Sequence, residues 1–195
     1  RAGPGLGGIS PSQGDYFQST RGGGHGDYYH LVLAPKSVQE AADLTYEAFD
    51  LAEKWRMPVM VLADGLIGQM MERGVLPPVR DASTRPDRPW AAGGHAGVSR
   101  PNNHLCSMFL DPPVLEASVR ARFERYGRIA KECVRFEESG TKDADLVLVA
   151  YGTSARSCLG AMQRARELGL KLGLFRPSSR WPFPPQSLAR LAAAG

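Results

Sequence analysis

Two stretches of this chain repeat one pattern, in which a short apolar segment is followed by an amphipathic segment and then by a second short apolar segment. The first stretch runs from His30 to Ala63 and the second from Asp145 to Phe175. Apolar runs of this length are typical of buried parallel strands, which need a helix to cross from one to the next. The chain is therefore predicted to be an α/β protein with two parallel-sheet units.

In the first unit, strands are expected at His30–Ala34 and Pro58–Ala63, with a helix between them. Ser37 and Glu40 have the spacing of a capping box, in which a hydroxyl and a carboxylate satisfy free backbone N–H groups at a helix start. Pro58 is expected to end the helix, because proline has no N–H to donate. The buried face of this helix is expected to comprise Val38, Ala41, Ala42, Thr45, Ala48, Phe49, Ala52 and Trp55.

In the second unit, strands are expected at Asp145–Tyr151 and Leu170–Phe175, with a helix over Ala155–Leu168 between them. The turn at 152–154 (Gly-Thr-Ser) precedes the helix, where free N–H groups can bind an anion. Ser and Thr are also ordinary helix caps, so both interpretations stay open. A last helix is expected over Pro185–Ala194.

Residues 73–104 are rich in proline, glycine and charge, so they are predicted to be a linker. Asp111 is expected to cap a long helix, since Pro112 stands at the first helical position, where proline is favoured. An apolar stripe at helical spacing extends this helix to about Phe136.

Composition limits the function classes. The chain has 195 residues, 43% of them hydrophobic and 23% charged, with a net charge of +4, and its cations are scattered, which argues against nucleic-acid binding. No apolar run has the length of a membrane span, and no secretory signal pattern is present. Cys106, Cys133 and Cys158 are widely spaced without a C-x-x-C pair, so no iron–sulfur cluster is expected on this chain, and a reducing cytoplasm suits them.

The first 30 residues hold nine of the chain's 22 glycines, together with several aromatic residues, and are predicted to form an ordered functional loop. The Gly3–Gly8 segment could suggest a phosphate cradle in a nucleotide-binding α/β enzyme. No strand precedes it and no Lys-Ser/Thr pair follows it, so a tightly turned loop is the better interpretation.

Other polar residues could bear chemistry but also have plain structural roles. His25 and His30 are five residues apart, yet metal binding needs a third convergent ligand, so hydrogen-bonded loop histidines are favoured. Asp15, Asp27 and Asp64 stand at loops or strand ends, where α/β folds place ligands and where turn and cap residues also occur.

Several runs of the sequence resemble one family. GPGLG, PSQGDYFQ and GGGHGDY near the start, followed by LDPPVLEASVR, DADLVLVAYGTSAR and RPSSRWPFP, resemble the α-type subunit of 2-oxoacid:ferredoxin oxidoreductases. The likeness covers nearly the whole chain, is weakest at about 73–104, and is nearer to the 2-oxoisovalerate type than to the 2-oxoglutarate type.

This resemblance implies a domain organisation. Residues 1–72 would be the C-terminal half of a pyrimidine-type thiamine-diphosphate domain, 73–140 a linker with a long helix, and 141–195 the N-terminal part of a domain similar to the transketolase C-terminal domain. The chain would then be a fragment, inactive alone. The glutamate that activates the cofactor would lie before residue 1, so no catalytic residue is assigned here.

The resemblance also implies an activity, which is oxidative decarboxylation of a branched-chain 2-oxoacid to an acyl-CoA with electrons passed to ferredoxin. Thiamine diphosphate with Mg²⁺ would lie at the interface with a β-type subunit, and 4Fe-4S clusters would be carried by partner subunits. The implied partners are the β-type subunit, γ-type and ferredoxin-like subunits, ferredoxin, a small 2-oxoacid and coenzyme A.

Site residues follow from the same resemblance. Arg1 matches an arginine that would bind the substrate carboxylate, for which a planar guanidinium fork is suited. The loop of Ser12, Gln13, Gly14 and Asp15 would lie at the active-site mouth or a subunit interface. One departure is that the Ser178–Arg180 segment stands where apolar residues are expected before Trp-Pro-Phe-Pro.

Two alternatives remain. The family could be right and the substrate different, with 2-oxoglutarate or another 2-oxoacid in place of 2-oxoisovalerate. A chain of this composition could also be a non-catalytic α/β assembly or interaction subunit.

Overall fold

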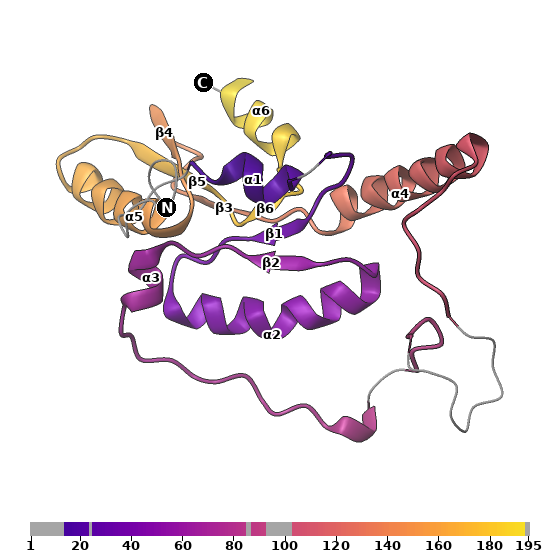
Figure 1. Cartoon of the computed structure of the whole chain (residues 1–195). Coiled ribbons are helices and arrows are strands. Elements are labelled where there is room, and N and C mark those ends of the chain that lie inside the picture. The colour runs from indigo at the N-terminus through magenta and orange to yellow at the C-terminus, as the bar shows by residue number, and fades with distance from the viewer. Residues whose placement is uncertain (1–13, 24, 85–86, 93–102, 194–195) are drawn as a thin grey trace. The chain divides into compact units, whose positions relative to one another are not determined.

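The computed structural model describes residues 14–23, 25–84, 87–92 and 103–193 (Figure 1). Its helices are α1 (Tyr16–Arg21), α2 (Val38–Trp55), α3 (Gly65–Gln69), the 3-10 turn η1 (Ala82–Thr84), α4 (Pro112–Glu132), α5 (Gly152–Glu167) and α6 (Pro185–Ala193). Its strands are β1 (Leu31–Leu33), β2 (Val59–Val61), β3 (Phe136–Ser139), β4 (Leu146–Val149), β5 (Leu172–Pro177) and β6 (Ser179–Trp181).

The chain divides into two compact units. One comprises the described residues of 1–77 and 125–195, and the other comprises those of 78–124. The second unit contains η1 and the first part of α4. All six described strands belong to the first unit, so the candidate site is sought there. The domain boundaries expected at residues 72 and 140 remain a prediction.

The strands form two three-stranded sheets, in the orders β2-β1-β6 and β3-β5-β4. In the first sheet β1 is parallel to β2, with Val32 opposite Met60, and in the second β4 is parallel to β5, with Leu148 opposite Leu174. These pairs and their crossover helices, α2 and α5, confirm the prediction of an α/β protein built from two strand–helix–strand units. Each sheet also gains one antiparallel strand, so both sheets are mixed.

The antiparallel strand β6 joins the two halves of the first unit. It follows β5 of the second sheet directly, yet it pairs with β1 of the first sheet, with Leu33 opposite Ser179. Figure 1 shows α2 along one side of this sheet and α1 along the other. One continuous segment, from β5 into β6, thus contributes to both sheets.

Helix α2 begins as predicted. The Ser37 hydroxyl accepts a hydrogen bond from the backbone N–H of Glu40 at 3.1 Å, and the helix ends at Arg56, which has the left-handed conformation (φ 50°). The predicted buried face was wrong in part: Phe49 is 67% exposed, whereas Leu44 and Leu51 are buried with Trp55. Large leucine side chains bury more apolar area than the alanine-rich face does, and they set how the helix is turned.

Helix α4 begins at Pro112 as predicted but ends at Glu132, earlier than expected. The prediction that it extends to about Phe136 was wrong, because Phe136 opens strand β3 and pairs with Pro177 of β5. Phe136 also stacks on Phe175, with ring centroids 5.2 Å apart. Its apolar spacing continues that of the helix, so periodicity alone could not locate the end.

The core of the first unit lies between the first sheet, α2 and the last turns of α4. Tyr29, Tyr126 and Trp181 pack their rings together, with Tyr29 stacked on Trp181 at 5.0 Å between centroids. Ile129 of α4 is completely buried. The cluster comprises Leu31, Leu33, Leu44, Leu51, Trp55, Met57, Tyr126, Ile129 and Cys133.

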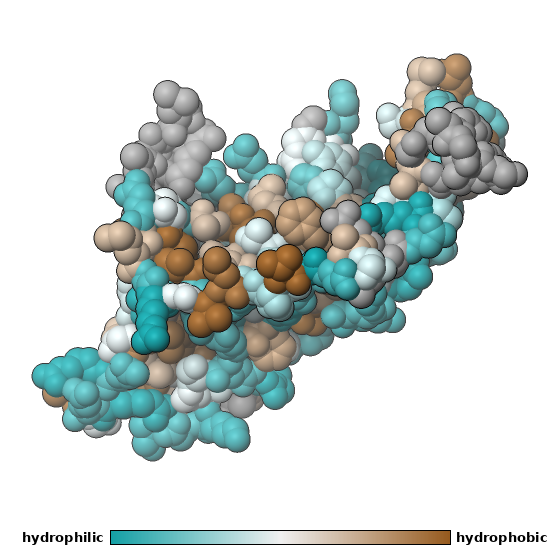
Figure 2. All heavy atoms as spheres, turned by 90° about the horizontal axis from the view of Figure 1, so that it is seen from below, coloured by the Kyte–Doolittle hydropathy of each residue, from teal (hydrophilic) through white to brown (hydrophobic). Residues whose placement is uncertain are grey.

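Apolar side chains also lie on the surface. Met71 and Leu76, in the extended segment after α3, are 96% and 85% exposed. Figure 2 shows apolar residues (brown) among hydrophilic ones on the face seen from below. Among the described helices, none has both the length and the apolar character needed to cross a membrane.

We predict that Ile129→Ala lowers the free energy of unfolding by about 2–5 kcal/mol, because it removes buried methylene groups and leaves a cavity. Val114→Ala is the matched control, since Val114 on the same helix is 49% exposed and its truncation should cost much less. Urea unfolding of the full-length protein measures both. Equal losses would contradict the placement of the core.

Candidate functional site

Strands from both parallel pairs bring their carboxyl ends to one place in the first unit. Strand β1 is followed by Pro35, β2 by Asp64 and β4 by Gly152. A Cβ added at Gly152 would lie 3.2 Å from a carboxylate oxygen of Asp64 and 3.9 Å from the carbonyl oxygen of Pro35. The carboxyl ends of strands are where open α/β sheets bind ligands. We therefore call Asp64, Tyr151, Gly152, Thr153 and the groups that contact them the carboxyl-end site.

Asp64 caps two helices at once. Its Oδ1 accepts the backbone N–H groups of Leu66 and Ile67 at the start of α3, at 3.1 and 3.0 Å. Near the start of α5, Thr153 donates its backbone N–H to Oδ2 at 3.0 Å and its hydroxyl to Oδ1 at 2.7 Å. A helix N-terminus carries partial positive charge, so a carboxylate there is favourable.

Gly152 makes this arrangement possible. Its φ of 57° lies in the left-handed region, which glycine adopts without the steric penalty that a Cβ brings. The absence of a side chain also lets Asp64 approach the first turn of α5 closely. Of the two interpretations left open for residues 152–154, the capping role is the one observed, with the carboxylate of Asp64 as the acceptor, and the predicted turn is already the first turn of the helix.

The hydrogen bonds around Asp64 decide its chemistry. Burial raises the pKa of this carboxyl, but the hydrogen bonds from Thr153, Ile67 and Leu66 together outweigh burial and hold the pKa below 3.8. A carboxylate with four hydrogen-bond donors has little capacity left to accept a proton from a substrate. Asp64 is therefore a structural anion rather than a general base.

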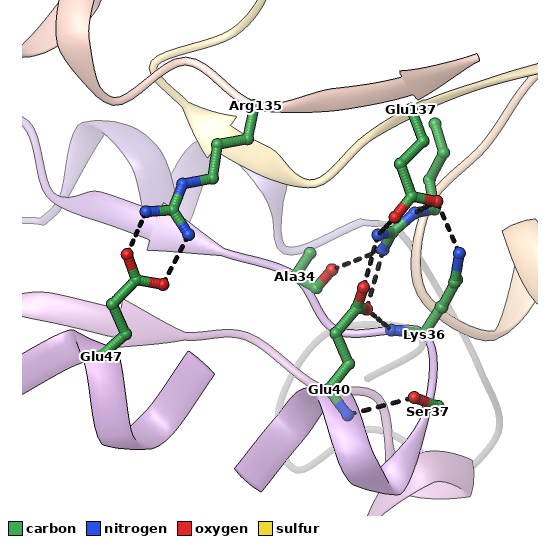
Figure 3. Close-up of polar contacts among 8 residues, drawn as sticks. Ala34, Lys36, Ser37, Glu40, Glu47, Arg135 and Glu137 are labelled. Carbon is green, nitrogen blue, oxygen red and sulfur yellow. Dashed lines mark hydrogen bonds and ion pairs between the residues drawn. The ribbon is translucent and has the colours of Figure 1, made fainter. Parts of the chain in front are cut away.

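A fully buried arginine connects the two sheets, and its partners Ala34, Glu40 and Glu137 lie close together in Figure 3. Arg176 of β5 is 2% exposed at its side chain. It donates two hydrogen bonds to Glu40, at 2.9 and 2.6 Å, and two to Glu137, at 3.0 and 2.7 Å. A fifth goes to the carbonyl oxygen of Ala34 at 3.3 Å. A guanidinium has five N–H donors, so each of them has an acceptor here.

The two carboxylates have further partners. Glu40 accepts the backbone N–H of Lys36 at 2.7 Å, which extends the capping of α2, and the Lys36 ammonium lies 2.5 Å from Glu137. Burial raises the pKa of Glu137, but the hydrogen bonds and charges of Arg176 and Lys36 lower it to about 2. We call Lys36, Glu40, Glu137 and Arg176 the Arg176 cluster, and Glu137 within it is ionised at neutral pH.

The Ser178–Arg180 segment, expected to be apolar, is buried and polar. Ser179 has no exposed surface. Its hydroxyl donates to the carbonyl oxygen of Pro182 at 2.6 Å and accepts the N–H of Arg135 at 2.8 Å. Arg135 in turn forms a two-pronged ion pair with Glu47 of α2. Hydrogen bonding therefore compensates for the missing apolar contacts at Ser179.

Arg180 has a different environment. It is 7% exposed, and its guanidinium carbon lies 3.8 Å from the ring centroid of Tyr151, 5.0 Å from that of Tyr16 and 5.7 Å from that of Phe183. The Tyr16 hydroxyl donates to the backbone carbonyl of Arg180 at 3.4 Å. Tyr151 is the N-cap residue of α5, so this aromatic box adjoins the carboxyl-end site. Sequence reasoning noticed Arg180 only as a charged residue in an apolar run.

Of the predicted site residues, Arg1, Ser12 and Gln13 lie outside the described residues, as does the Gly3–Gly8 segment. Gly14 is exposed, and Asp15 is partly buried immediately before α1. The charge of Asp15 contributes to the raised pKa of Tyr151, whose main cause is burial. The end of the predicted loop is thus close to the aromatic box, while its assigned role remains a prediction.

The remaining candidates have no shared site. The described residues contain no group of three or more His, Cys, Asp or Glu side chains placed to hold a metal ion. His30 contacts the Tyr28 ring, and Asp27 has a positive φ of 60°, typical of a turn. None of the three cysteines forms a disulfide, and burial raises the pKa of the Cys133 thiol, which makes it a poor nucleophile.

Two protein families match successive parts of this chain. Residues 1–132 match the family described as "Pyruvate flavodoxin/ferredoxin oxidoreductase, thiamine diP-bdg", and residues 144–195 match "Pyruvate:ferredoxin oxidoreductase core domain II". A ketoisovalerate oxidoreductase subunit VorB of Methanothermobacter thermautotrophicus is 47% identical over 195 residues, which are 100% of this chain and 54% of that protein. A 2-oxoglutarate synthase subunit KorA of Methanocaldococcus jannaschii is 32% identical over 220 residues, covering 99% of this chain and 58% of that protein.

A solved structure supports the fold. The 2-oxoglutarate:ferredoxin oxidoreductase from Magnetococcus marinus superposes with a TM-score of 0.73 at 23% identity, over 100% of this chain and 38% of that one. The fold and its convergent strand ends define an α/β protein with a ligand edge at the carboxyl ends of its strands. The chain belongs to the pyruvate flavodoxin/ferredoxin oxidoreductase family, which confirms the resemblance inferred from its motifs.

The chain spans about half the length of the curated relatives that it matches. The family description names thiamine diphosphate, a cofactor whose diphosphate needs a metal ion or cationic groups. The described residues offer no metal-binding cluster, and the carboxylate at the strand ends is already hydrogen-bonded within the chain. The described residues therefore include no set of ligands placed to hold a diphosphate-bound metal ion.

We predict that Arg176→Met lowers the free energy of unfolding by about 1–3 kcal/mol, because it removes the buried cation that donates four hydrogen bonds to Glu40 and Glu137. Arg164→Met is the matched control, since Arg164 is 72% exposed at its side chain and pairs only with Glu167 one helical turn away. Arg164→Met should change the free energy of unfolding by no more than about 0.5 kcal/mol. Urea unfolding that finds similar losses for both variants would contradict the proposed importance of the cluster.

We predict a pH-dependent effect for Asp64→Asn. At pH 7 the substitution should lower the free energy of unfolding by about 1–2 kcal/mol, because the amide cannot accept all four hydrogen bonds. The folded-state pKa of Asp64 lies below 3.8, so the stabilisation is complete above about pH 4 and is lost as the pH falls through the lower folded-state pKa. The difference between wild type and variant in urea unfolding should therefore shrink below pH 4. A constant difference down to pH 3 would refute the role of the charge.

Proposed function

We propose that the protein containing this chain is a 2-oxoacid:ferredoxin oxidoreductase that acts on branched-chain 2-oxoacids of the 2-oxoisovalerate type. The observation that carries the proposal is 47% identity over all 195 residues to a ketoisovalerate oxidoreductase subunit, against 32% to a 2-oxoglutarate synthase subunit. The reaction would convert the 2-oxoacid and coenzyme A into an acyl-CoA and CO₂, with electrons passed one at a time to ferredoxin.

Thiamine diphosphate would supply the decarboxylation chemistry, as the family description indicates. This chain would contribute a wall of the cofactor site rather than the ligands of the diphosphate, which suits the lack of a metal-binding cluster among its described residues. Mg²⁺ would be bound with a β-type partner subunit, and 4Fe-4S clusters would be carried by other subunits. The relatives are named as subunits, which supports an assembly of several polypeptides. A location in the cytoplasm is part of the proposal.

Within this assembly, Arg1 would bind the substrate carboxylate, and the loop of Ser12, Gln13, Gly14 and Asp15 would border the active-site mouth. Arginine suits this role because its fork donates two parallel hydrogen bonds to a carboxylate. The position of Asp15 supports the proposal, since its charge acts on Tyr151 at the carboxyl-end site. The described end of the loop would then border the edge where an α/β fold binds its ligands.

The test uses the full-length protein, produced without oxygen together with the products of neighbouring genes. Reduction of ferredoxin or a viologen dye is measured with coenzyme A and either 2-oxoisovalerate, 2-oxoglutarate or pyruvate. We expect thiamine-dependent turnover that prefers 2-oxoisovalerate. Preference for another 2-oxoacid would reject the substrate, and a lack of thiamine-dependent turnover with all three would reject the activity.

In the same assay, Arg1→Ala should lower kcat/KM for the 2-oxoacid by about tenfold to a hundredfold, the usual effect of losing a charged hydrogen bond. KM for coenzyme A should stay unchanged. Arg164→Ala on the exposed face of α5 serves as the control. An Arg1→Ala enzyme with unchanged kcat/KM would rule out the carboxylate role.

A further inference from the structure

Arg180 is a buried cation whose hydrogen-bonding capacity is not used by the described residues. Its side chain belongs to strand β6, and the residue is 7% exposed. Within the described ranges, Nε and Nη1 are both buried and donate no hydrogen bond. Arg176, four residues earlier, donates five. Buried N–H groups without acceptors are unfavourable, so the contrast calls for an acceptor from outside the described residues.

The charge of Arg180 also lacks a counter-ion. Arg176 has Glu40 and Glu137 as ion-pair partners, but no carboxylate of the described chain forms an ion pair with Arg180. Burial accordingly lowers the pKa of Arg180, and only the nearby hydroxyl groups of Tyr151 and Tyr16 counteract this electrostatically. An anion that reached this guanidinium would relieve both deficits together.

The rings of the aromatic box orient the guanidinium without satisfying it. Tyr151 lies 3.8 Å from the guanidinium carbon and Tyr16 lies 5.0 Å from it, both measured to the ring centroids. Rings interact with the flat faces of a guanidinium, whereas its N–H groups point outward in the plane. The box therefore holds the cation in place and leaves its donors for an acceptor in that plane.

The surroundings favour a negatively charged ligand. Tyr151 is the N-cap of α5, a 16-residue helix whose N-terminus carries partial positive charge. The first turn of that helix is already held by Asp64, so Arg180 is the group with capacity to spare. Helix N-terminus and guanidinium both suit the oxygens of a carboxylate or a phosphate.

We propose that Arg180, held by Tyr16, Tyr151 and Phe183, is a binding site for the oxyanion group of a ligand, either a carboxylate or a phosphate. The proposal is argued from Arg180 and its described neighbours and does not rest on the proposed function. A 2-oxoacid could bring the carboxylate, and coenzyme A or free phosphate could bring the phosphate.

Binding is tested on the full-length protein purified with its partner subunits. The probes are inorganic phosphate and isovalerate, a carboxylate that cannot be oxidatively decarboxylated, with ionic strength held constant by KCl. The concentration dependence of the thermal midpoint gives the apparent Kd of each probe. Wild type is compared with Arg180→Gln, which removes the charge, with Arg180→Lys, which keeps it, and with Arg164→Gln as the surface control.

We expect at least one probe to raise the midpoint of wild type and of Arg164→Gln. Its apparent Kd should rise about tenfold or more in Arg180→Gln, with Arg180→Lys in between. If Arg180→Gln does not assemble, the same comparison is made with Arg180→Lys. The proposal is overturned if neither probe shifts the wild type, or if the substituted enzyme responds as wild type does, since Arg180 would then have only a structural role.

Steady-state kinetics distinguishes the two possible sources of the oxyanion group. A rise in KM for the 2-oxoacid in Arg180→Lys would assign the site to the substrate carboxylate, and a rise in KM for coenzyme A would assign it to a phosphate. Because the probe binding is read without catalysis, an enzyme that turns over no 2-oxoacid would reject the proposed function and leave the binding result intact.

Discussion

The first unit of this protein depends on the burial of one guanidinium between three separate segments. Arg176 on β5 reaches Glu40 at the start of α2, Glu137 on β3 and the carbonyl oxygen that follows β1. Burying an ion this deeply is costly unless its donors have acceptors, so the contacts of Arg176 are complete only when all three segments are in place. Neither sheet can therefore acquire its final polar contacts without the other. The same contacts place α2 and the carboxyl end of β1 against the second sheet, on which the carboxyl-end site is built.

Much of this architecture could be predicted from local patterns. The strand–helix–strand units, the cap at Ser37 and the start of α4 at Pro112 depend on near neighbours in sequence, and the structure confirms them. Phe136 was misplaced because a strand residue happened to continue a helical spacing. The pairing of β6 with β1 joins residues almost 150 positions apart. The Ser-Arg-Trp tripeptide of β6 is too short to predict β1 as its pairing partner.

The polar sites show the same limit more sharply. Its position after a strand made Asp64 a candidate site residue. Only the fold shows that its carboxylate accepts hydrogen bonds from the starts of both α3 and α5. Arg176 and Arg180 have the same side chain and are four residues apart, yet one has five acceptors and the other has aromatic rings. Sequence context cannot separate them, because the acceptors of Arg176 come from β3, α2 and the end of β1. The predicted loop residues Arg1, Ser12 and Gln13 were inferred from resemblance, and that inference stands on the family relationship alone.

The shared carboxylate of Asp64 has a consequence for selectivity. A ligand anion that approached the first turn of α5 would have to compete with a carboxylate that is already covalently part of the chain, and therefore present at a very high local concentration. Displacing Asp64 would also uncap α3. The incoming anion would therefore have to replace the hydrogen bonds lost at two helix ends rather than one. Asp64 thus competes with free anions for the N-terminus of α5 and disfavours their binding there. Anionic ligands would instead bind the neighbouring guanidinium of Arg180.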